Sequence, residues 1–357
     1  MFQPNFRISP SATQALMDIE ASRQAVSSLP VSSQLFASLR ESARLTSTHY
    51  STQIEGNRLT EAEVAVVAKG GTFPNRKRDE AEVKNYFFAL DYLDEVLAHS
   101  SAELTPELIQ IIHGCVLDGK QKPTPYREGQ NVIRESGSGS IIYMPPEWRD
   151  VPELMNDLVS WVNEELSKGE LPAPIIAGIA HYQFATIHPY YDGNGRTARL
   201  LTNFVLHLSG YGLKGIYSLE EYYARNLRTY YQAISVGDSH NYYESNRAEA
   251  DISDWVEYFS QGMADSFASV RVQAEKLKSK PDQSKLLREL DNRQKRILEA
   301  FRESRFLTTK EIADYLGVSS RTGLNLCNGW INSDFLLKEG ERKSRRYELA
   351  PAWLELL

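Results

Sequence analysis

Apolar residues recur at steps of three and four over most of the chain, a spacing typical of helices with one buried face. It predicts helices over residues 81–98, 152–166 and 174–186, and a further helix from near Gly195 to Gly210. In the first helix the apolar positions are Val83, Phe87, Leu90, Leu93 and Leu97. We therefore expect a mainly α-helical protein.

The segment 129–148 departs from this pattern. Two short extended stretches, Asn131–Arg134 and Ser140–Met144, flank the sequence Gly-Ser-Gly at 137–139, which is typical of a β-hairpin with a flexible tip. Two prolines follow, and proline ends a strand because it has no amide hydrogen to donate. One hairpin is expected within an otherwise helical body.

The C-terminal part follows a polar stretch with a proline around residues 280–285, which we interpret as a linker. Beyond it three helices are predicted, the second beginning with a threonine and the third with a serine cap, over residues 293–304, 309–316 and 319–332. Residues 335–349 then read as two strands around a charged tip. This order of elements is the outline of a winged helix-turn-helix.

The composition is typical of a soluble protein in a reducing compartment. Of the 357 residues, 41% are hydrophobic and 24% are charged, which is enough apolar material for one large core or two smaller ones. The two cysteines, Cys115 and Cys327, lie far apart in the sequence, so no disulfide framework is expected. We find no signal segment and no run of the roughly 18 apolar residues that a membrane span needs. A cytoplasmic location without membrane contact is expected.

Charge is divided unevenly along the chain. The net charge is −7, from 40 Lys and Arg against 47 Asp and Glu. Residues 283–357 hold 14 basic and 11 acidic residues, a net of +3, which leaves 26 against 36, a net of −10, for the rest. This balance argues against a chain that coats nucleic acid throughout, but it leaves DNA binding by the C-terminal part open.

Residues 188–199, His-Pro-Tyr-Tyr-Asp-Gly-Asn-Gly-Arg-Thr-Ala-Arg, contain the candidate chemistry. They join a buried helix to the start of the next one, where unpaired N–H groups and the helix dipole attract anions. Gly193 and Gly195 let the backbone come close to a ligand. Arg196 and Arg199 are three residues apart and so face the same side of the helix. Two guanidiniums beside such a turn suit a polyphosphate.

Asp192 and His188 add reactive groups to this loop. A lone carboxylate beside phosphates is a typical Mg²⁺ ligand, and a neutral imidazole can take a proton from an attacking hydroxyl. A P-loop does not fit because no Gly-Lys-Ser/Thr follows, and one His with one Asp does not supply the four ligands of a zinc site. Gly-Asn-Gly alone is more often a helix-capping turn, but the full set of groups is far rarer by chance.

These residues resemble the signature of the Fic (filamentation induced by cAMP) family, with Tyr190 where Phe is commoner. The resemblance implies a helical Fic core that moves AMP from ATP onto a protein hydroxyl. His188 would be the general base and Asp192 would hold Mg²⁺. The ATP phosphates would be bound by Gly193, Asn194, Gly195, Arg196 and Arg199.

The resemblance also implies a flap and an adenine site, and it adds the Fic core to the domains that the sequence pattern indicates. The hairpin, with Ile141, Ile142 and Tyr143, would hold the target segment by strand addition. Tyr231 would line the adenine pocket, although tyrosines at such spacing are more often core residues. The domains would be an N-terminal helical region (1–50), the Fic core (51–260), a helix with linker (261–285) and the winged helix-turn-helix (286–357).

Residues 51–57, Ser-Thr-Gln-Ile-Glu-Gly-Asn, resemble the inhibitory motif of the same family. Ser51 and Glu55 are four residues apart and share one helix face. The resemblance implies that Glu55 forms an ion pair with Arg199, the residue that would otherwise bind the γ-phosphate. ATP could still bind, but its α-phosphate would not be in line with the attacking hydroxyl. Gly56 and Asn57 complete the motif. Taken alone, Glu55 would read as a surface residue near a helix end.

Three functions are therefore carried forward. The first is AMP transfer to Ser, Thr or Tyr hydroxyls of proteins, including the enzyme itself. The second is another reaction on the same scaffold: transfer of UMP, phosphate or phosphocholine, or removal of AMP. The third is a DNA-binding regulator that uses helix 319–332 and the basic residues 342–346, although Arg321 is the one cation of that helix. A homodimer is expected from the resemblance only.

Overall fold

The computed structural model describes residues 2–28, 33–99, 102–134, 139–237, 240–244, 249–278, 287–340 and 345–356. The chain divides into two compact units, residues 1–274 and 275–357. The prediction of a mainly helical protein is confirmed. Within the described residues, no helix combines the length and the apolar character needed to cross a bilayer.

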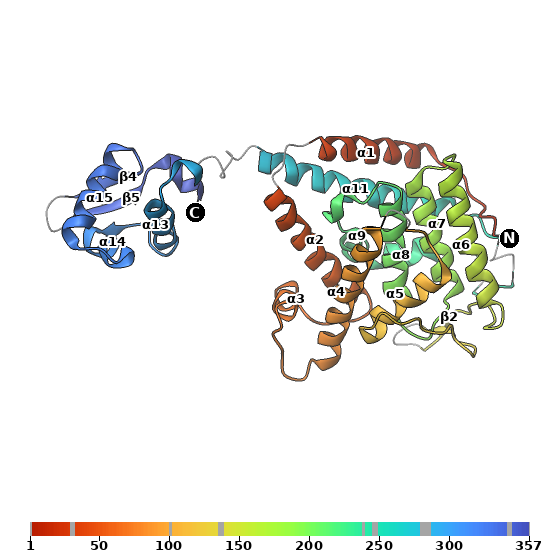
Figure 1. Cartoon of the computed structure of the whole chain (residues 1–357). Coiled ribbons are helices and arrows are strands. Elements are labelled where there is room, and N and C mark those ends of the chain that lie inside the picture. Colours follow the sequence, from red (N-terminus) through yellow and green to blue (C-terminus); the bar gives the residue numbers. More distant parts are fainter. Residues whose placement is uncertain are drawn as a thin grey trace. The chain divides into compact units, whose positions relative to one another are not determined.

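The first unit consists of helices and one hairpin (Figure 1). In chain order its elements are α1 (Pro10–Ser27), α2 (Ser33–Ile54), α3 (Glu61–Ala68), α4 (Lys77–Leu97), α5 (Pro106–Asp118), β1 (Ile133–Arg134), β2 (Ile141–Tyr143), α6 (Val151–Lys168), α7 (Ala173–Ile187), α8 (Asn194–Leu208), η1 (Leu213–Gly215), α9 (Leu219–Arg225), α10 (Leu227–Ile234) and α11 (Ser253–Lys278). A single helix, α11, thus spans the position where the core was expected to end.

Helix α7 is buried along its length, as its almost wholly apolar sequence predicts. It packs between α6 and α8. α11 also contacts it closely: the Trp255 indole donates to the Gly178 carbonyl at 2.7 Å, and a Cβ on Gly178 would lie 2.7 Å from Phe259. Because both ends of the candidate loop belong to α7 and α8, this packing holds the loop on a rigid support.

Helix α2 packs across α4, α8 and α9. A buried carboxylate, Glu220 on α9, joins these helices: it accepts from Ser47 on α2 at 2.9 Å, from Tyr86 on α4 at 3.1 Å and from Asn203 on α8 at 3.2 Å. Burial of a carboxylate is costly unless hydrogen bonds satisfy it. The network therefore fixes the half of α2 that leads to Ser51 and Glu55.

The hairpin is present but shorter than the sequence predicted. β1 and β2 pair antiparallel over Ile133–Arg134 and Ile141–Tyr143, with an irregularity in β1, whereas strands were expected over 131–134 and 140–144. Part of the expected tip, residues 137 and 138, lies outside the described residues. After β2, Met144 leaves the hairpin and bonds to another segment, accepting from the amide of Tyr242 at 3.0 Å.

The second unit contains α13 (Asn292–Glu303), β3 (Leu307–Thr308), α14 (Thr309–Leu316), α15 (Ser320–Asn332), β4 (Leu336–Glu339), β5 (Arg346–Leu349) and η4 (Pro351–Leu356). The strands form an antiparallel sheet in the order β3-β5-β4. The sequence missed β3, because two residues are too short for a visible alternation. The expected linker at 280–285 and residues 342–344 lie outside the described residues.

One capping prediction in this unit was wrong by a residue. The threonine that caps α14 is Thr308, whose hydroxyl accepts from the Glu311 amide, while Glu311 bonds back to the Thr308 amide. Thr309 is the first helical residue instead. The serine cap of α15 is Ser319, as predicted.

Candidate functional site

The loop between α7 and α8 has two residues in the left-handed region of backbone conformation. His188 ends α7 with φ 51° and ψ 60°, and Gly193 precedes α8 with φ 77°. The Asn194 side chain closes the loop, because it accepts from the Tyr190 amide at 3.0 Å and donates to the Tyr190 carbonyl at 2.8 Å. With its side chain used in this way, Asn194 offers a ligand only its backbone.

His113 on α5 packs against the loop and supports it. The ring of His113 stacks on Tyr190 at 3.5 Å between centroids, and its Nε2 lies 2.9 Å from the Asp192 carbonyl. Its Nδ1 lies 2.6 Å from the Thr124 hydroxyl. A Cβ on Gly193 would stand 3.1 Å from the same imidazole. The sequence analysis did not single out His113 and named no helix over α5.

His188 is half-buried, with its side chain beside the loop. Burial lowers its pKa to about 4, and the charge of Arg127 lowers it further, while a hydrogen bond to the Ala185 backbone, Glu55 and Asp192 oppose the shift. An imidazole with this pKa is neutral near pH 7, because it protonates only in acid. It can therefore accept a proton from a hydroxyl group.

The first turn of α8 presents cationic and amide groups. Arg196 is 3% exposed, and its Nε has no hydrogen-bond partner within the described residues. Its guanidinium lies 3.4 Å from the exposed carboxylate of Asp192, which also accepts from the Gly193 amide at 2.6 Å. A buried guanidinium with an unpaired N–H at a helix N-terminus is a suitable place for an anion.

Arg199 connects this turn to α2. It is 2% exposed and donates to the Ser51 hydroxyl, to the Ser51 carbonyl and to Glu55 Oε1, each at 2.8 Å. Burial alone would lower the pKa of Arg199, but Glu55, with Tyr230 and Tyr86, raises it above its usual range. The two sequence motifs, 144 residues apart, thus meet in one ion pair.

The Glu55 carboxylate lies directly against the first turn of α8. A Cβ added to Gly195 would be 2.1 Å from Glu55 Oε1 and 3.2 Å from Arg199 Nη1. The carboxylate therefore fills the space over Gly195 that an anion bound at this helix end would need. Gly195 leaves room for an acidic group, whether it is a side chain or a phosphate.

Gly56 and Asn57 shape the end of α2. Gly56 has φ 92°, a conformation that favours glycine. The Asn57 amide donates to the Asp79 carbonyl and to Glu82, both at 2.9 Å, and its oxygen accepts from the Leu59 amide at 3.1 Å. These two residues hold Glu55 in place and do not reach the loop themselves in any bond described here.

Arg127 is a second residue that the sequence analysis missed. It is 2% exposed and donates to the carbonyls of His188 at 3.0 Å, Gly129 at 3.2 Å and Pro146. It lies in the loop between α5 and β1, where no spacing rule marks it out. Its contacts are with backbone atoms, which a sequence pattern does not display.

The hairpin lies next to the loop and has two exposed isoleucines. Ile141 and Ile142 are 42% and 45% exposed, whereas the Tyr143 hydroxyl donates to the Thr186 carbonyl of α7 at 2.8 Å. The Asn131 amide donates to the Tyr190 carbonyl at 3.1 Å. Tyr143 is therefore an anchor to α7, whereas the two isoleucines remain exposed.

Tyr231 on α10 is 47% exposed. Its ring lies 5.3 Å from that of Tyr230, which is buried and bonded to His181 at 2.9 Å. Burial raises the pKa of Tyr231, and Glu55 adds to this effect, so Tyr231 lies near the Glu55–Arg199 pair. Of the two tyrosines, Tyr230 belongs to the core and Tyr231 is exposed.

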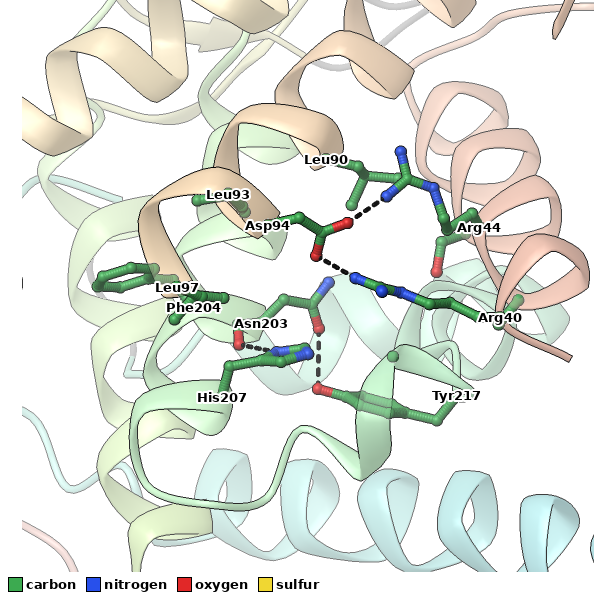
Figure 2. Close-up of a pocket in the computed structure, with 13 residues that line it drawn as sticks. Arg40, Arg44, Leu90, Leu93, Asp94, Leu97, Asn203, Phe204, His207 and Tyr217 are labelled. Carbon is green, nitrogen blue, oxygen red and sulfur yellow. Dashed lines mark hydrogen bonds and ion pairs between the residues drawn. The ribbon is translucent and has the colours of Figure 1, made fainter. Parts of the chain in front are cut away.

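A pocket beside α2 contains the ion pairs that hold the first half of this helix (Figure 2). Asp94 on α4 receives Arg40 and Arg44 of α2, each at 2.6 Å, and Arg44 also pairs with Asp91. Figure 2 shows the Asp94 carboxylate between the two guanidiniums. These pairs are partly exposed, so each contributes modestly, about 0–1 kcal/mol.

The residues of the candidate site also limit which metal ion could bind there. Within the described residues, no three His, Cys, Asp or Glu side chains gather as a metal cluster. An ion at Asp192 would need most of its ligands from phosphate and water, which Mg²⁺ accepts and a structural Zn²⁺ does not. The exposed carboxylate of Asp192 fits such a role.

Comparison with known proteins agrees with this arrangement. Residues 103–206 match the model of the Fic/DOC family, a segment that includes the hairpin, His188 and both loop arginines but not Ser51–Asn57. The chain is 32% identical over 181 residues to "Protein adenylyltransferase fic-1" of Caenorhabditis briggsae, covering 49% of this chain and 34% of the relative. It is 32% identical over 206 residues to "Protein adenylyltransferase Fic" of Nematostella vectensis, covering 56% and 46%. The chain thus spans between about a third and a half of these relatives.

Solved structures share the fold. A Fic family protein from Desulfovibrio desulfuricans superposes with a TM-score of 0.72 at 21% identity, over 98% of this chain and 99% of that one. A Fic domain-containing signalling protein from Bacteroides thetaiotaomicron has a TM-score of 0.62 at 25% identity, over 73% and 97%. Residues 103–206 therefore match the Fic/DOC family, and the structure shares its helical fold with these proteins.

Proposed function

We propose that this chain is a protein adenylyltransferase that transfers AMP from ATP to protein hydroxyls, its own included, and that Glu55 inhibits it. One observation carries the proposal: an acidic side chain lies over Gly195 and on Arg199, at a cationic helix end beside a neutral histidine. Relatives that match about half of this chain are named protein adenylyltransferases, and this supports AMP as the transferred group.

In the proposed reaction the target hydroxyl oxygen attacks the α-phosphorus of ATP. The bond from this phosphorus to the oxygen that bridges to the β-phosphate breaks, and pyrophosphate leaves. His188 takes the hydroxyl proton, which its low pKa permits near neutral pH. The backbone of residues 193–195 and Arg196 hold the α- and β-phosphates, and Arg199 holds the γ-phosphate once Glu55 has moved. Tyr231 lines the adenine site.

A Mg²⁺ ion would be held by Asp192 together with phosphate oxygens and water. When bound, it would neutralise charge on the phosphates and on the leaving pyrophosphate. The chain's own part is to place the Asp192 carboxylate, through the Gly193 amide and the His113 contact to the Asp192 carbonyl.

The hairpin would hold the target next to His188. An extended target segment would add as a strand beside Ile141 and Ile142, whose side chains are exposed. The main-chain bonds of such a strand read no sequence. Selectivity would therefore come from side chains that flank the attacking hydroxyl.

The second unit has the helix and strand order of a winged helix-turn-helix, which we propose it to be. Of the basic residues considered for DNA binding, Arg346 has partners within the second unit. Arg346 is paired with Glu339 at 2.8 Å and lies over the Phe306 ring at 4.1 Å, so it is not a free phosphate contact. We propose a protein-docking or dimerisation role, and salt-dependent retention on DNA would contradict it.

The proposal is tested by incubation with Mg²⁺ and ATP labelled at the α-phosphate, followed by mass spectrometry of the protein. Addition of AMP supports it. Addition of UMP from UTP, of phosphate or of phosphocholine would indicate another reaction on this scaffold. Thermal-shift assays against a panel of nucleotides, run on the same protein, would identify the preferred donor independently of any target.

The ion pairs of Asp94 give a prediction about the inhibitory helix. Asp94→Asn removes two pairs between α2 and α4, so we expect a loss of about 1 kcal/mol of stability and a rise in basal self-labelling of about fivefold or less. Asp91→Asn, which removes only one exposed pair, is the control and should change both less. Because salt screens such pairs, the difference from wild type should shrink as ionic strength rises. If Asp94→Asn labels itself faster than wild type by the same factor at every ionic strength, the explanation is contradicted.

The low pKa of His188 predicts that kcat/KM stays nearly constant as the pH falls below neutral. An unperturbed histidine would be about nine-tenths protonated at about pH 5.5 and would lose about tenfold in rate. With a pKa near 4, kcat/KM should change little between about pH 7.5 and 5.5, because the imidazole stays neutral. The activity profile of the Glu55→Gly variant checks this, and a tenfold loss by about pH 5.5 would show that His188 is not desolvated as described.

A further inference from the structure

Arg127 is a buried cation that backbone groups surround. Its donors meet the carbonyls of His188, Gly129 and Pro146, and its own amide donates to the Pro189 carbonyl at 2.9 Å. Within the described residues no carboxylate forms an ion pair with it. A buried guanidinium is costly unless its donors are satisfied, so here the three carbonyls determine where it can lie, and it in turn determines where they lie.

The carbonyls belong to two functional parts of the molecule. Gly129 precedes β1 and Pro146 follows β2, so they are the two ends of the hairpin. His188 and Pro189 belong to the loop between α7 and α8. One side chain thus holds both ends of the hairpin and the peptide of the histidine.

The histidine backbone needs such support. A non-glycine residue with φ 51° is held in a sparsely populated region, and neighbouring contacts must offset the strain. Arg127 bonds to the carbonyls of His188 and of the next residue, which is where this conformation turns the chain. Loss of the Arg127 guanidinium would let the peptide group of His188 relax and move the imidazole.

Other contacts join the hairpin to different segments: the Ile142 carbonyl lies 2.9 Å from His240 Nδ1, and the backbone of Met144 bonds to His240 and Tyr242. Tyr143 bonds to the Thr186 carbonyl and Asn131 to the Tyr190 carbonyl, so each joins one strand to one position. Gln130 bonds to Pro145 at 2.9 Å, within the hairpin base itself. Among these, only Arg127 joins both hairpin ends to His188.

We propose that Arg127 is a positioning residue that couples the target-holding hairpin to His188, so that target alignment and proton acceptance depend on one guanidinium. The inference rests on the proposed function. It adds a residue outside the recognised motifs that acts through the backbone and touches neither ATP nor target.

The test is Arg127→Lys in the Glu55→Gly protein. Lysine keeps the charge but, as a point donor on a flexible stem, does not reproduce the planar fork. We expect self-labelling to fall at least about tenfold, since small misplacements of reacting groups cost this much or more. Mg-ATP affinity, measured by calorimetry, should stay within about twofold, because Arg127 is not among the phosphate-binding groups.

Two further readouts separate coupling from a general defect. Hydrogen exchange of amides in residues 129–134 and 139–146 should quicken together with those of the loop 188–193. Release of AMP by attack of water on ATP, which needs no docked target, should fall less than transfer to protein. Arg149→Lys, a change at an exposed arginine outside the hairpin whose guanidinium lies over the Trp148 ring at 4.7 Å, is the matched control and should alter none of these.

Should Arg127→Lys not fold, Arg127→Gln, which buries no charge, gives the same comparison. Unchanged self-labelling in a folded variant would overturn the inference, as would equal losses of transfer and of ATP binding. A Glu55→Gly parent that transfers no AMP would instead end the proposed function, and this inference with it.

Discussion

Replacing Glu55 by glycine is expected to raise the rate of AMP transfer about a hundredfold. The carboxylate occupies Arg199 and the space over Gly195, so ATP that binds beside it cannot place its γ-phosphate there. Breaking a buried pair by removal of one partner typically amounts to about 3–5 kcal/mol. Because Glu55 is 30% exposed, we expect the lower end, and about 3 kcal/mol corresponds to about two orders of magnitude in rate.

The same substitution should change how ATP affects stability. Without Glu55, Arg199 keeps its bonds to Ser51 but loses the carboxylate that pairs with it, and a buried cation without a charged partner destabilises the fold. A γ-phosphate would restore the partner, so Mg-ATP should raise the melting temperature of Glu55→Gly more than that of wild type. Differential scanning fluorimetry with and without Mg-ATP measures this directly.

Two variants separate the effect of the charge from that of a new glycine. Gln53→Gly places glycine on the exposed side of the same helical turn and should not activate, although it loosens the helix end by about 1 kcal/mol. Glu55→Gln removes the charge but keeps the bulk, so an intermediate rate is expected. If Gln53→Gly activates as much as Glu55→Gly, the competition for Arg199 is not the cause of inhibition.

Replacing His188 by alanine in the Glu55→Gly protein should lower AMP transfer by about 10²–10⁴-fold, the usual contribution of a general base. The imidazole is desolvated and neutral, and it belongs to the loop that leads into the first turn of α8. ATP binding should persist, because the phosphate-binding groups lie on α8. A radiolabel time course with the matched parent measures the loss.

His99→Ala is the control for this loss, since His99 is exposed and far from the loop in sequence. It should label at the parental rate. A His188→Ala variant that binds Mg-ATP and still labels as fast as its parent would show that another group accepts the proton. A variant that no longer binds Mg-ATP would show that His188 instead supports the phosphate site.

Local sequence patterns were enough for much of the fold. The apolar repeat of α4, the apolar run of α7 and the proline-led start of α6 located these helices to within a few residues, because one buried face at a period near 3.6 is a local property. Short strands were predicted less well: β1 and β2 are shorter than expected, and β3 was missed. Two or three residues show no period, and their pairing depends on partners elsewhere in the chain.

The sequence by itself determined the chemistry of the loop: an imidazole, a carboxylate, two glycines and two arginines in the order a helix N-terminus requires. It could not show that Glu55 lies 2.8 Å from Arg199, which depends on how α2 packs against α8 and on the Glu220 network. Nor could it reveal Arg127 or His113. These two residues contact backbone carbonyls of segments that are distant in the sequence. Every residue type has the same backbone oxygen, so no sequence pattern marks these partners, and only the tertiary structure brings them within reach.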